Sequence, residues 1–399
     1  MLLHFRKIIF ILFIGLQANI VSALGLDPKS ILYMLLMLVI LYFIISPHHP
    51  RYLIVFFVSL ALLFWQRHIN GNVEGSIQLS AILAFPALFT ILLPNKAEKK
   101  NDYSFYKLVL KSLVLLFFVE FIFSYIEFFL HISILSYTND TYDSQGPMSR
   151  ATSLFGASLS NSLIISGLLF FILNSNLKNK YKFFIWSAGF LSLMCFQGRI
   201  AMIVSFTYLF LYLFSHMKKD VRKNFTSFIL GISILCIIII AFYMGLGDRL
   251  LNMGVFDESS SSVRSRMFEH LIDNYKLKDL LWGMSMDNLL FLMMEMQVLV
   301  IECFFVIHLL FFGLVFLIVF YTQYVLLIKK MLCEYELFFK IIAIPAYILI
   351  AFTNNSFASG STSLTMLLLF IRFFSPSVFN KVVPSKYLVT APSQTIVNN

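Results

Sequence analysis

Long, uninterrupted apolar segments are the feature that most restricts what this chain can fold into. Segments such as Val109–Leu130 and Val298–Ile328 are long enough to cross the hydrocarbon core of a bilayer, which is about 30 Å thick. Only 13% of the 399 residues are charged, whereas soluble domains average about 25%. We therefore expect a membrane protein, because a soluble core could not bury this much apolar surface.

The apolar segments predict about twelve spans, each helical because backbone groups in lipid must be paired within the segment. The expected fold class is all-α, a polytopic transmembrane helix bundle. We expect nine spans in residues 1–245, a periplasmic loop at 246–297, three spans in 298–374 and a mobile cytoplasmic tail at 375–399. The expected spans are 8–24, 31–46, 52–66, 77–93, 108–130, 153–173, 183–197, 200–215, 225–245, 298–327, 338–353 and 361–374.

The first apolar segment admits two interpretations. Arg6 and Lys7 precede it, and Val21-Ser22-Ala23 resembles a signal-peptide cleavage site. We expect an uncleaved first span, because polytopic membrane proteins rarely need a removable signal. A cleaved signal peptide is the alternative.

The basic residues predict the orientation of the bundle. With the N-terminus in the cytoplasm and alternating spans, about two thirds of the 30 Lys and Arg residues fall on the cytoplasmic side. The formal net charge of +10 is then mostly a topology signal, and no nucleic-acid partner is needed to explain it. The bilayer itself is the first expected partner.

Most basic residues on the predicted outer side are Arg, whereas the cytoplasmic set is mostly Lys. Arg presents a planar set of donors that suits phosphate, and it keeps its charge when partly buried. An anionic ligand at the outer leaflet is one explanation. Ordinary ion pairs with acidic loop residues, or snorkelling of Arg199 to the headgroups, are the alternatives. The candidate residues are Arg150, Arg199, Arg264 and Arg266.

The long outer loop carries a helical pattern. Val263, Met267, Leu271 and Tyr275 recur every four residues, which predicts a short amphipathic helix with Arg266 and His270 on one face. Leu281-Trp282-Gly283-Met284 predicts the turn that follows. At about fifty residues, the loop is too small for an independent domain and should pack on the bundle.

Few ionisable residues lie inside the predicted spans, and these are candidates for function. Glu302 is placed about one turn inside the tenth span, and Glu120 and Glu127 lie in the fifth. A paired or protonated structural carboxyl is the alternative for each. His308 is interpreted as a helix-packing histidine. No Gly-rich phosphate loop and no cluster with metal-ligand spacing is present, so we expect neither a cofactor nor a metal.

Four stretches, in order along the chain, resemble the superfamily of O-antigen polymerases and O-antigen ligases. They are Arg150-Ala-Thr-Ser-Leu-Phe-Gly156 running to Asn161, Gln197-Gly-Arg199-Ile-Ala201, Ser262-Val-Arg264-Ser-Arg266 followed by Leu281-Trp-Gly283-Met284, and Glu302 leading to Gly313-Leu314. Two positions depart from the family pattern: Ser160 replaces a usual proline, and Glu302 stands where the ligases have histidine. The second departure suits a polymerase better.

The resemblance implies a GT-C-like glycosyltransferase without a metal. It would transfer an undecaprenyl-diphosphate-linked oligosaccharide to another lipid-linked repeat at the periplasmic face. The implied diphosphate-binding residues are Arg150, Arg199, Arg264, Arg266 and Asn161. The implied catalytic residues are Glu302 as the base, Arg199 and Arg266, with Glu127 and His270 as secondary candidates.

The resemblance also allows a chain-length regulator as a partner. Two other functions remain open: an O-antigen ligase, and a flippase or other transporter of lipid-linked oligosaccharide. A transporter would carry polar residues at mid-membrane on several helices, whereas here they gather at the outer ends of spans.

Overall fold

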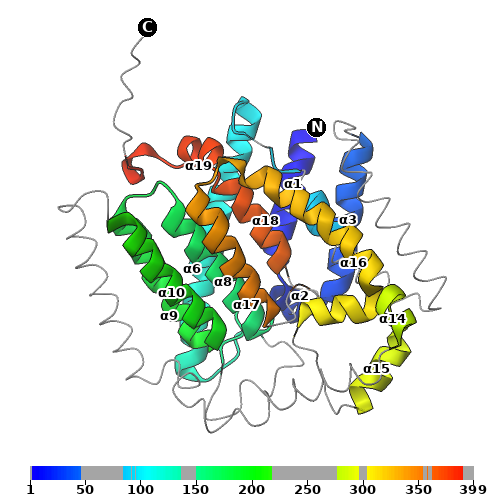
Figure 1. Cartoon of the computed structure of the whole chain (residues 1–399). Helices are drawn as coiled ribbons and strands as arrows, with labels where there is room; N and C mark the ends of the chain where they lie inside the picture. The colour runs from blue at the N-terminus through cyan, green and yellow to red at the C-terminus, as the bar shows by residue number, and fades with distance from the viewer. Residues whose placement is uncertain are drawn as a thin grey trace.

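The computed structural model describes residues 2–45, 84–90, 92–94, 96–135, 150–217, 276–295, 303–353, 357 and 362–389. Within these ranges the regular structure is helical, without a strand, and one β-bridge joins Leu177 to Leu388. The helices form a bundle (Figure 1). The expected all-α class is therefore confirmed for the described part of the chain.

Three described helices are long and apolar enough to cross a membrane: α3 (Pro28–Ile45), α6 (Lys100–Leu130) and α16 (Phe304–Met331), the last prolonged to Glu334 by a 3-10 turn. A fourth span is possible in length if α18 (Ser363–Phe373) and α19 (Pro376–Val382), which meet at 75°, are counted together. The count of about twelve spans stays a prediction, and two of its spans, 52–66 and 225–245, lie outside the described residues.

The other described helices are shorter. The first expected span is divided in two, because Leu16 and Gln17 interrupt the helix. A π-helical turn, Phe339–Ala343, precedes α17, where Pro345 removes one backbone donor. The helices are α1 (Leu2–Gly15), α2 (Ala18–Ala23), α8 (Ser158–Asn174), α9 (Asn179–Phe196), α10 (Arg199–Met217), α14 (Leu277–Trp282), α15 (Met286–Glu295) and α17 (Ile344–Phe352).

Helix α8 is the centre of the bundle, and almost all of its side chains are buried. It packs against α9, α10, α17 and α18. Small residues permit these close approaches: a Cβ at Gly189 would lie 2.6 Å from Leu169, and a Cβ at Gly198 would lie 2.4 Å from the Ser162 hydroxyl. Small residues at helix contacts are characteristic of helix packing within membranes.

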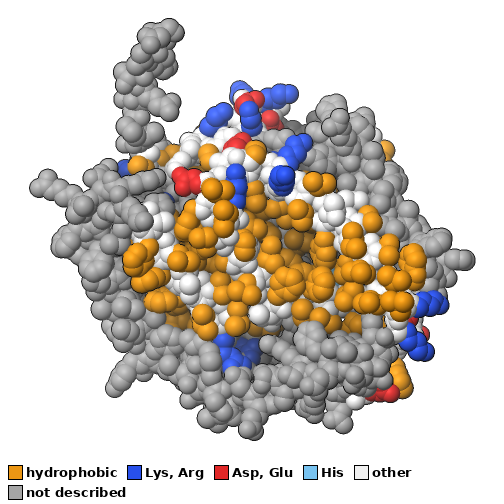
Figure 2. Space-filling view, in the orientation of Figure 1, with side chains coloured by type: hydrophobic (Ala, Val, Ile, Leu, Met, Phe, Trp, Pro, Cys, Tyr) orange, Lys and Arg blue, Asp and Glu red, His pale blue; other side chains and the backbone are white. Residues whose placement is uncertain are grey.

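The surface carries a broad apolar belt with basic residues beyond its edges (Figure 2). Large apolar side chains of the described helices are freely exposed, such as Phe184 at 74% and Ile44 at 71%. A soluble protein rarely exposes a patch of this size. The belt and the apolar helices together indicate a protein embedded in a membrane.

Helix α16 is not the continuous span that was expected at 298–327. It begins at Phe304, after Cys303 in extended conformation, and it is broken at Gly313 (φ 77°, ψ 166°). The break frees the Leu310 carbonyl, which accepts a 2.8 Å hydrogen bond from the Met284 amide. Of the turn expected at residues 281–284, Leu281 and Trp282 end α14, and Gly283 and Met284 leave the helix and fill the break. The amphipathic helix expected at 263–275 lies outside the described residues.

The expectation of a mobile tail is wrong for its first part. Residues 376–389 form α19, a 3-10 turn at Ser385–Tyr387 and the bridge to Leu177. The Lys178 amide donates to the Tyr387 carbonyl at 2.8 Å, which ties the segment to the α8–α9 connection. The buried contacts that polarity alone did not reveal come from Val378, Phe379, Val382, Val383 and Leu388.

Candidate functional site

The loop at residues 150–157 leads into α8, and two carboxylates of α6 accept hydrogen bonds from its backbone. Oε2 of Glu127 accepts hydrogen bonds from the amides of Thr152 and Ser153 at 2.8 and 2.9 Å. Oε2 of Glu120 accepts from the Ser153 hydroxyl at 2.8 Å and from the Leu154 amide at 3.1 Å. Both carboxylates are buried, so the bonds to Oε2 replace part of their hydration, whereas Oε1 of Glu120 has no hydrogen-bond partner among the described residues.

Two asparagines hold the same loop by its carbonyl groups. Asn161 of α8 donates from Nδ2 to Thr152, Gly156 and Ala157, and its Oδ1 accepts the Phe155 amide at 3.0 Å. Asn19 of α2 donates from Nδ2 to the carbonyls of Thr152, Ser153 and Gly156.

Two helices distant in sequence, α2 and α6, and the adjoining α8 thus satisfy one short buried loop. Ser153 has a positive φ of 43°, and Gly156 has a φ of 110°. The backbone of the 150–157 loop therefore cannot pair in a regular helix or strand and needs these side chains as partners.

This loop presents Arg150 at one end of the bundle. The half-buried Arg150 places Nη1 3.4 Å from the hydroxyl of Ser158, the first residue of α8. The next amide, of Ala151, donates to the carbonyl of Cys195 in the last turn of α9 at 3.2 Å. The loop is therefore fixed to the turn that begins α10.

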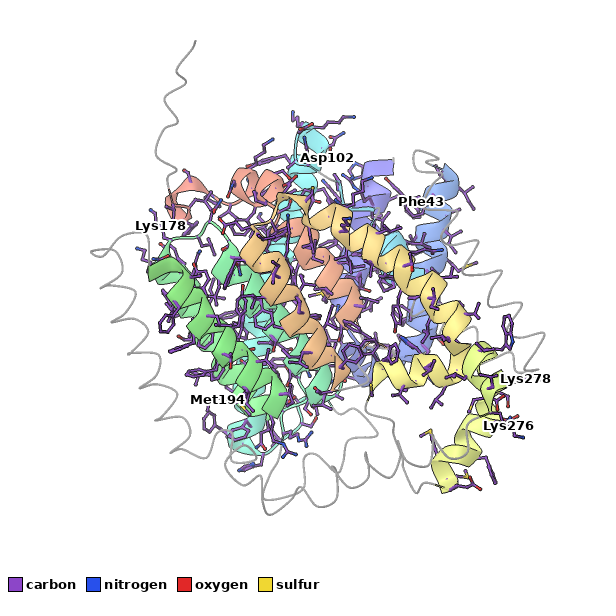
Figure 3. The ribbon with its side chains drawn as sticks, in the orientation of Figure 1. Phe43, Asp102, Lys178, Met194, Lys276 and Lys278 are labelled. Atoms are coloured by element: carbon purple, nitrogen blue, oxygen red, sulfur yellow. The ribbon has the colours of Figure 1, made fainter. Side chains whose placement is uncertain are left out.

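Arg199 lies at this same end. It is the first residue of α10, it is half-buried, and it follows Gly198, which packs directly on Ser162 of α8. Met194, one turn earlier in α9, lies toward the opposite end of the bundle from Asp102 and Lys178 (Figure 3). Arg150 thus lies beside the N-terminus of α8, and Arg199 lies in the first turn of α10.

Two predicted site residues have engaged side chains. Glu127 uses both oxygens: besides the two amides above, Oε1 accepts the Ile134 amide at 3.1 Å. Asn161 uses both ends of its amide on the 150–157 loop. In this arrangement both residues position Arg150. Their expected roles, as a secondary base and as a diphosphate ligand, stay predictions.

The remaining predicted site residues, Arg264, Arg266, His270 and Glu302, lie outside the described residues. His308 is described and is buried, as expected of a packing histidine. Its Nδ1 lies 2.7 Å from the hydroxyl of Tyr321, beyond the break in α16.

Sequence reasoning missed Asn19 and Gln17. Asn19 contacts carbonyl groups 133 to 137 residues away. Gln17 is fully buried at the interruption between α1 and α2 and accepts the Thr362 hydroxyl at 2.8 Å. Their signal was a pair of amide side chains within an apolar segment that was otherwise interpreted as an unbroken span.

Comparisons with protein families, with curated proteins and with solved structures give no match for this chain. The fold and the loop geometry therefore define the class: a helical membrane protein with two arginines at one end of its bundle.

Proposed function

We propose that this protein is a glycosyltransferase of the O-antigen polymerase kind. Its donor is an oligosaccharide linked by diphosphate to undecaprenol, and its acceptor is a second lipid-linked repeat. The reaction takes place at the periplasmic face of the bacterial inner membrane, within a GT-C-like bundle of about twelve spans.

The placement of Arg150 beside the N-terminus of α8 and of Arg199 in the first turn of α10 carries the proposal. The N-terminal end of a helix has partial positive charge, so a cation in the first turn does not stabilise the helix. Positive charges placed there favour an anion instead, and backbone amides add donors to the same ligand. A diphosphate at the membrane surface meets both conditions.

The proposed step exchanges one bond for another at the donor sugar. The acceptor hydroxyl oxygen forms a bond to the anomeric carbon, and the bond from that carbon to the diphosphate oxygen breaks. The diphosphate leaves with the electron pair, and the guanidinium groups of Arg150 and Arg199 stabilise its charge. The hydroxyl proton passes to a carboxylate, for which Glu302 is the candidate.

A rigid support for Arg150 agrees with this role. Stabilisation of a leaving group is effective when the donors need no reorganisation during the reaction. Glu120, Glu127, Asn161 and Asn19 fix the backbone beside Arg150, so that its position does not depend on the ligand. Arg264 and Arg266 are proposed to complete the site from the long loop.

The test is genetic complementation, read by electrophoresis of the surface polysaccharide. A deletion strain that makes single repeats without a ladder indicates a polymerase. Loss of all attached glycan indicates a ligase, and loss of lipid-linked repeats at the outer face indicates a flippase.

The arginine variants then test the site. Arg150→Ala and Arg199→Ala should leave the protein inserted and reduce polymerisation by about 100-fold or more, the effect of losing one preorganised donor. Lys29→Ala, at an exposed basic residue of the same predicted side, is the matched control. Normal ladders in both arginine variants would remove the diphosphate role.

A further inference from the structure

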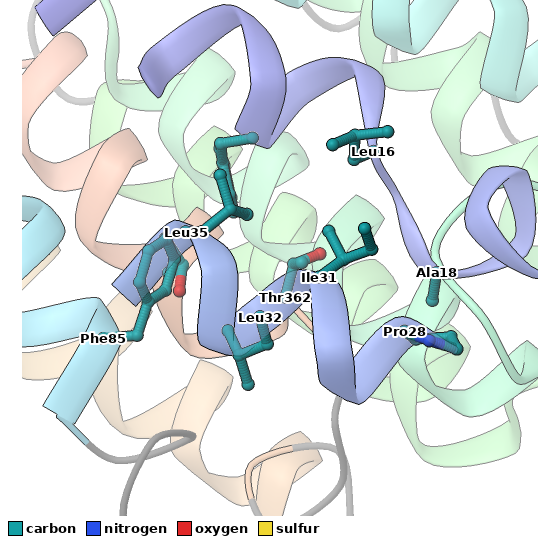
Figure 4. A pocket seen from close by; sticks show the side chains of 10 residues that line it. Leu16, Ala18, Pro28, Ile31, Leu32, Leu35, Phe85 and Thr362 are labelled. Carbon is teal, nitrogen blue, oxygen red and sulfur yellow. The ribbon is translucent and has the colours of Figure 1, made fainter. Parts of the chain in front are cut away.

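A small cavity lies beside the interruption between α1 and α2. Leu16 and Ala18 line it on one side and Leu32 of α3 on another (Figure 4). Its volume of about 30 Å³ has room for a water molecule or two, but not for a sugar or a lipid tail. A buried side chain at the break in α16 carries more information about the reaction.

His308 is a polar side chain in apolar surroundings. It is 1% exposed, and the rings of Phe304 and Phe312 lie beside it. Its Nδ1 lies 2.7 Å from the Tyr321 hydroxyl, whereas its Nε2 has no hydrogen-bond partner among the described residues. A buried polar atom without a partner is unfavourable, and a phenylalanine in this place would avoid it. Packing alone therefore does not account for a histidine here.

The hydrogen bond between His308 and Tyr321 joins the two halves of α16. His308 lies before the break at Gly313, and Tyr321 lies after it. In a continuous helix these residues, 13 apart, would be separated by about 20 Å along the axis. The bond can form because α16 changes direction at the break (Figure 1). Phe305, also before the break, stacks on the same Tyr321 ring at 6.3 Å.

The first half of α16 follows the candidate base closely in the chain. The helix begins at Phe304, and one extended residue, Cys303, separates it from Glu302. Glu302 itself lies outside the described residues. Because neighbouring Cα atoms are about 3.8 Å apart, a change in the direction of the first half carries Glu302 with it.

We propose that His308 is a positioning residue, whose bond to Tyr321 holds the first half of α16 at a fixed angle and thereby places Glu302. The proposal rests on the function proposed above and gives a part in it to a residue that touches neither donor nor acceptor. Accurate placement matters because a shift of about 1 Å in a reacting group can cost about 100-fold in rate. Packing of Phe305 on the Tyr321 ring, without the hydrogen bond, is the alternative that the test separates.

Four substitutions isolate the hydrogen bond. His308→Phe and Tyr321→Phe each remove it and keep an aromatic ring. His308→Asn keeps a polar atom near the place of Nδ1, so it serves as the conservative rescue. Tyr347→Phe, in α17, is the matched control, because it removes another buried tyrosine hydroxyl, which donates to the Ser363 carbonyl at 3.4 Å.

The angle between the two halves can be measured without any activity. Spin-labelled amino acids are placed at Leu309, before the break, and at the exposed Leu326, after it, in the full-length protein in phospholipid nanodiscs. Electron double resonance then gives the distribution of distances between the labels. His308→Phe and Tyr321→Phe should each shift the ratio of held to released halves by about fivefold, the equivalent of one hydrogen bond. His308→Asn should shift it less, and Tyr347→Phe should leave it unchanged.

Activity is measured on the same proteins with a synthetic undecaprenyl-diphosphate disaccharide. His308→Phe and Tyr321→Phe should each lower kcat about fivefold with KM unchanged, and the double variant should lose no more than either alone, because both changes remove one bond. His308→Asn should recover part of the loss. A histidine with a purely structural role would instead lower thermal stability and leave kcat unchanged.

The distances and the rates separate this proposal from the function itself. An unchanged distance distribution in both phenylalanine variants would overturn the proposal, because packing on the Tyr321 ring would then be sufficient. A shifted distribution with unchanged kcat would overturn the placement of Glu302. Normal ladders in the arginine variants would reject the polymerase, whereas the distances would still decide whether the bond holds the two halves.

Discussion

Two interruptions of the bundle are held in opposite ways. The 150–157 loop is held by side chains, because carboxylates and amides from α2, α6 and α8 take the place of backbone partners. The break in α16 is held by backbone against backbone: a Cβ at Gly283 would lie 2.2 Å from the Phe311 carbonyl oxygen, and one at Gly313 would lie 2.4 Å from that of Leu281.

The difference teaches which substitutions each region can tolerate. Side-chain hydrogen bonds can be removed one at a time, so damage to the 150–157 loop should be graded. The backbone contact between Gly283 and Gly313 cannot be weakened in steps, because even one added methyl group at either glycine would push the two segments apart. The 150–157 loop also carries Arg150, and the several side-chain hydrogen bonds to the loop fix the position of that arginine.

The largest expected effect is that of Gly283→Ala. The new methyl group would meet backbone atoms of Phe311 and Gly313, which cannot move aside, at a φ of 81°. We expect a loss of more than about 4 kcal/mol in the free energy of unfolding, the range of severe single substitutions. Unfolding in a detergent titration measures it.

Gly156→Ala is the matched control for this prediction. It has a φ of 110°, but its Cβ would meet only Ala18 at 3.8 Å. It should therefore show backbone strain alone, about 1–3 kcal/mol. Equal losses in the two alanine variants would mean that the close approach of α14 and α16 does not hold the break.

The second effect concerns the buried carboxylate. Glu127→Gln keeps the shape but turns one acceptor into a donor, and both oxygens of Glu127 accept amides. At least one backbone amide then loses its acceptor and faces the new NH₂ group, which costs about 1–3 kcal/mol. The same thermal or detergent unfolding assay measures it. Glu98→Gln, at an exposed side chain, serves as the control and should leave stability unchanged.

Most helices could be located from apolar segments, but not where they begin. The fifth span was expected at 108–130, and α6 covers Lys100–Leu130. Its first turns carry Lys, Asn and Asp, which hydropathy excludes although helix propensity tolerates them. The interruption at Gln17 and the break at Gly313 were missed, because a single polar or glycine residue is common within membrane helices.

The candidate site could be predicted only in part, for a related reason. Glu120 and Glu127 are seven residues apart, so the sequence already places them on one face of a helix. What that face meets depends on the 150–157 loop and on Asn19, contacts between residues distant in sequence. Polar residues in a span can serve a ligand or the backbone, and only the packing decides between them.

A smaller effect is expected at the other carboxylate of α6. The buried hydroxyl of Ser153 donates to Oε2 of Glu120 at 2.8 Å. Ser153→Ala removes this bond and keeps the Leu154 amide as a partner of the same oxygen. We expect a loss of about 1–2 kcal/mol in unfolding free energy. A loss larger than that of Glu127→Gln would contradict the graded behaviour proposed here.

The smallest effect is expected at Asp27, an exposed carboxylate that also accepts two backbone amides. Asp27 accepts the amides of Lys29 and Ser30 at 3.2 and 3.1 Å at the start of α3, much as Glu127 accepts consecutive amides in the interior. Asparagine caps helices about as well as aspartate, so Asp27→Asn should change stability by less than about 0.5 kcal/mol at neutral pH.

The pH dependence of the Asp27 cap predicts how the stability difference between the wild type and Asp27→Asn changes on acidification. Slight burial acts to raise the pKa of Asp27, but hydrogen bonds from Lys29 and Ser30 and the Lys29 charge outweigh it, so the pKa lies below its ordinary value of 3.8. The ionised cap therefore stabilises the fold above that value, and its contribution is lost as the pH falls through the lowered pKa. The Asp27→Asn variant lacks this loss. The free energy of unfolding of the wild type, measured from pH 6 down to about pH 3, should therefore fall relative to that of the variant. If the wild type instead becomes more stable than the variant on acidification, the ionised Asp27 carboxylate does not stabilise the start of α3 through the amides of Lys29 and Ser30.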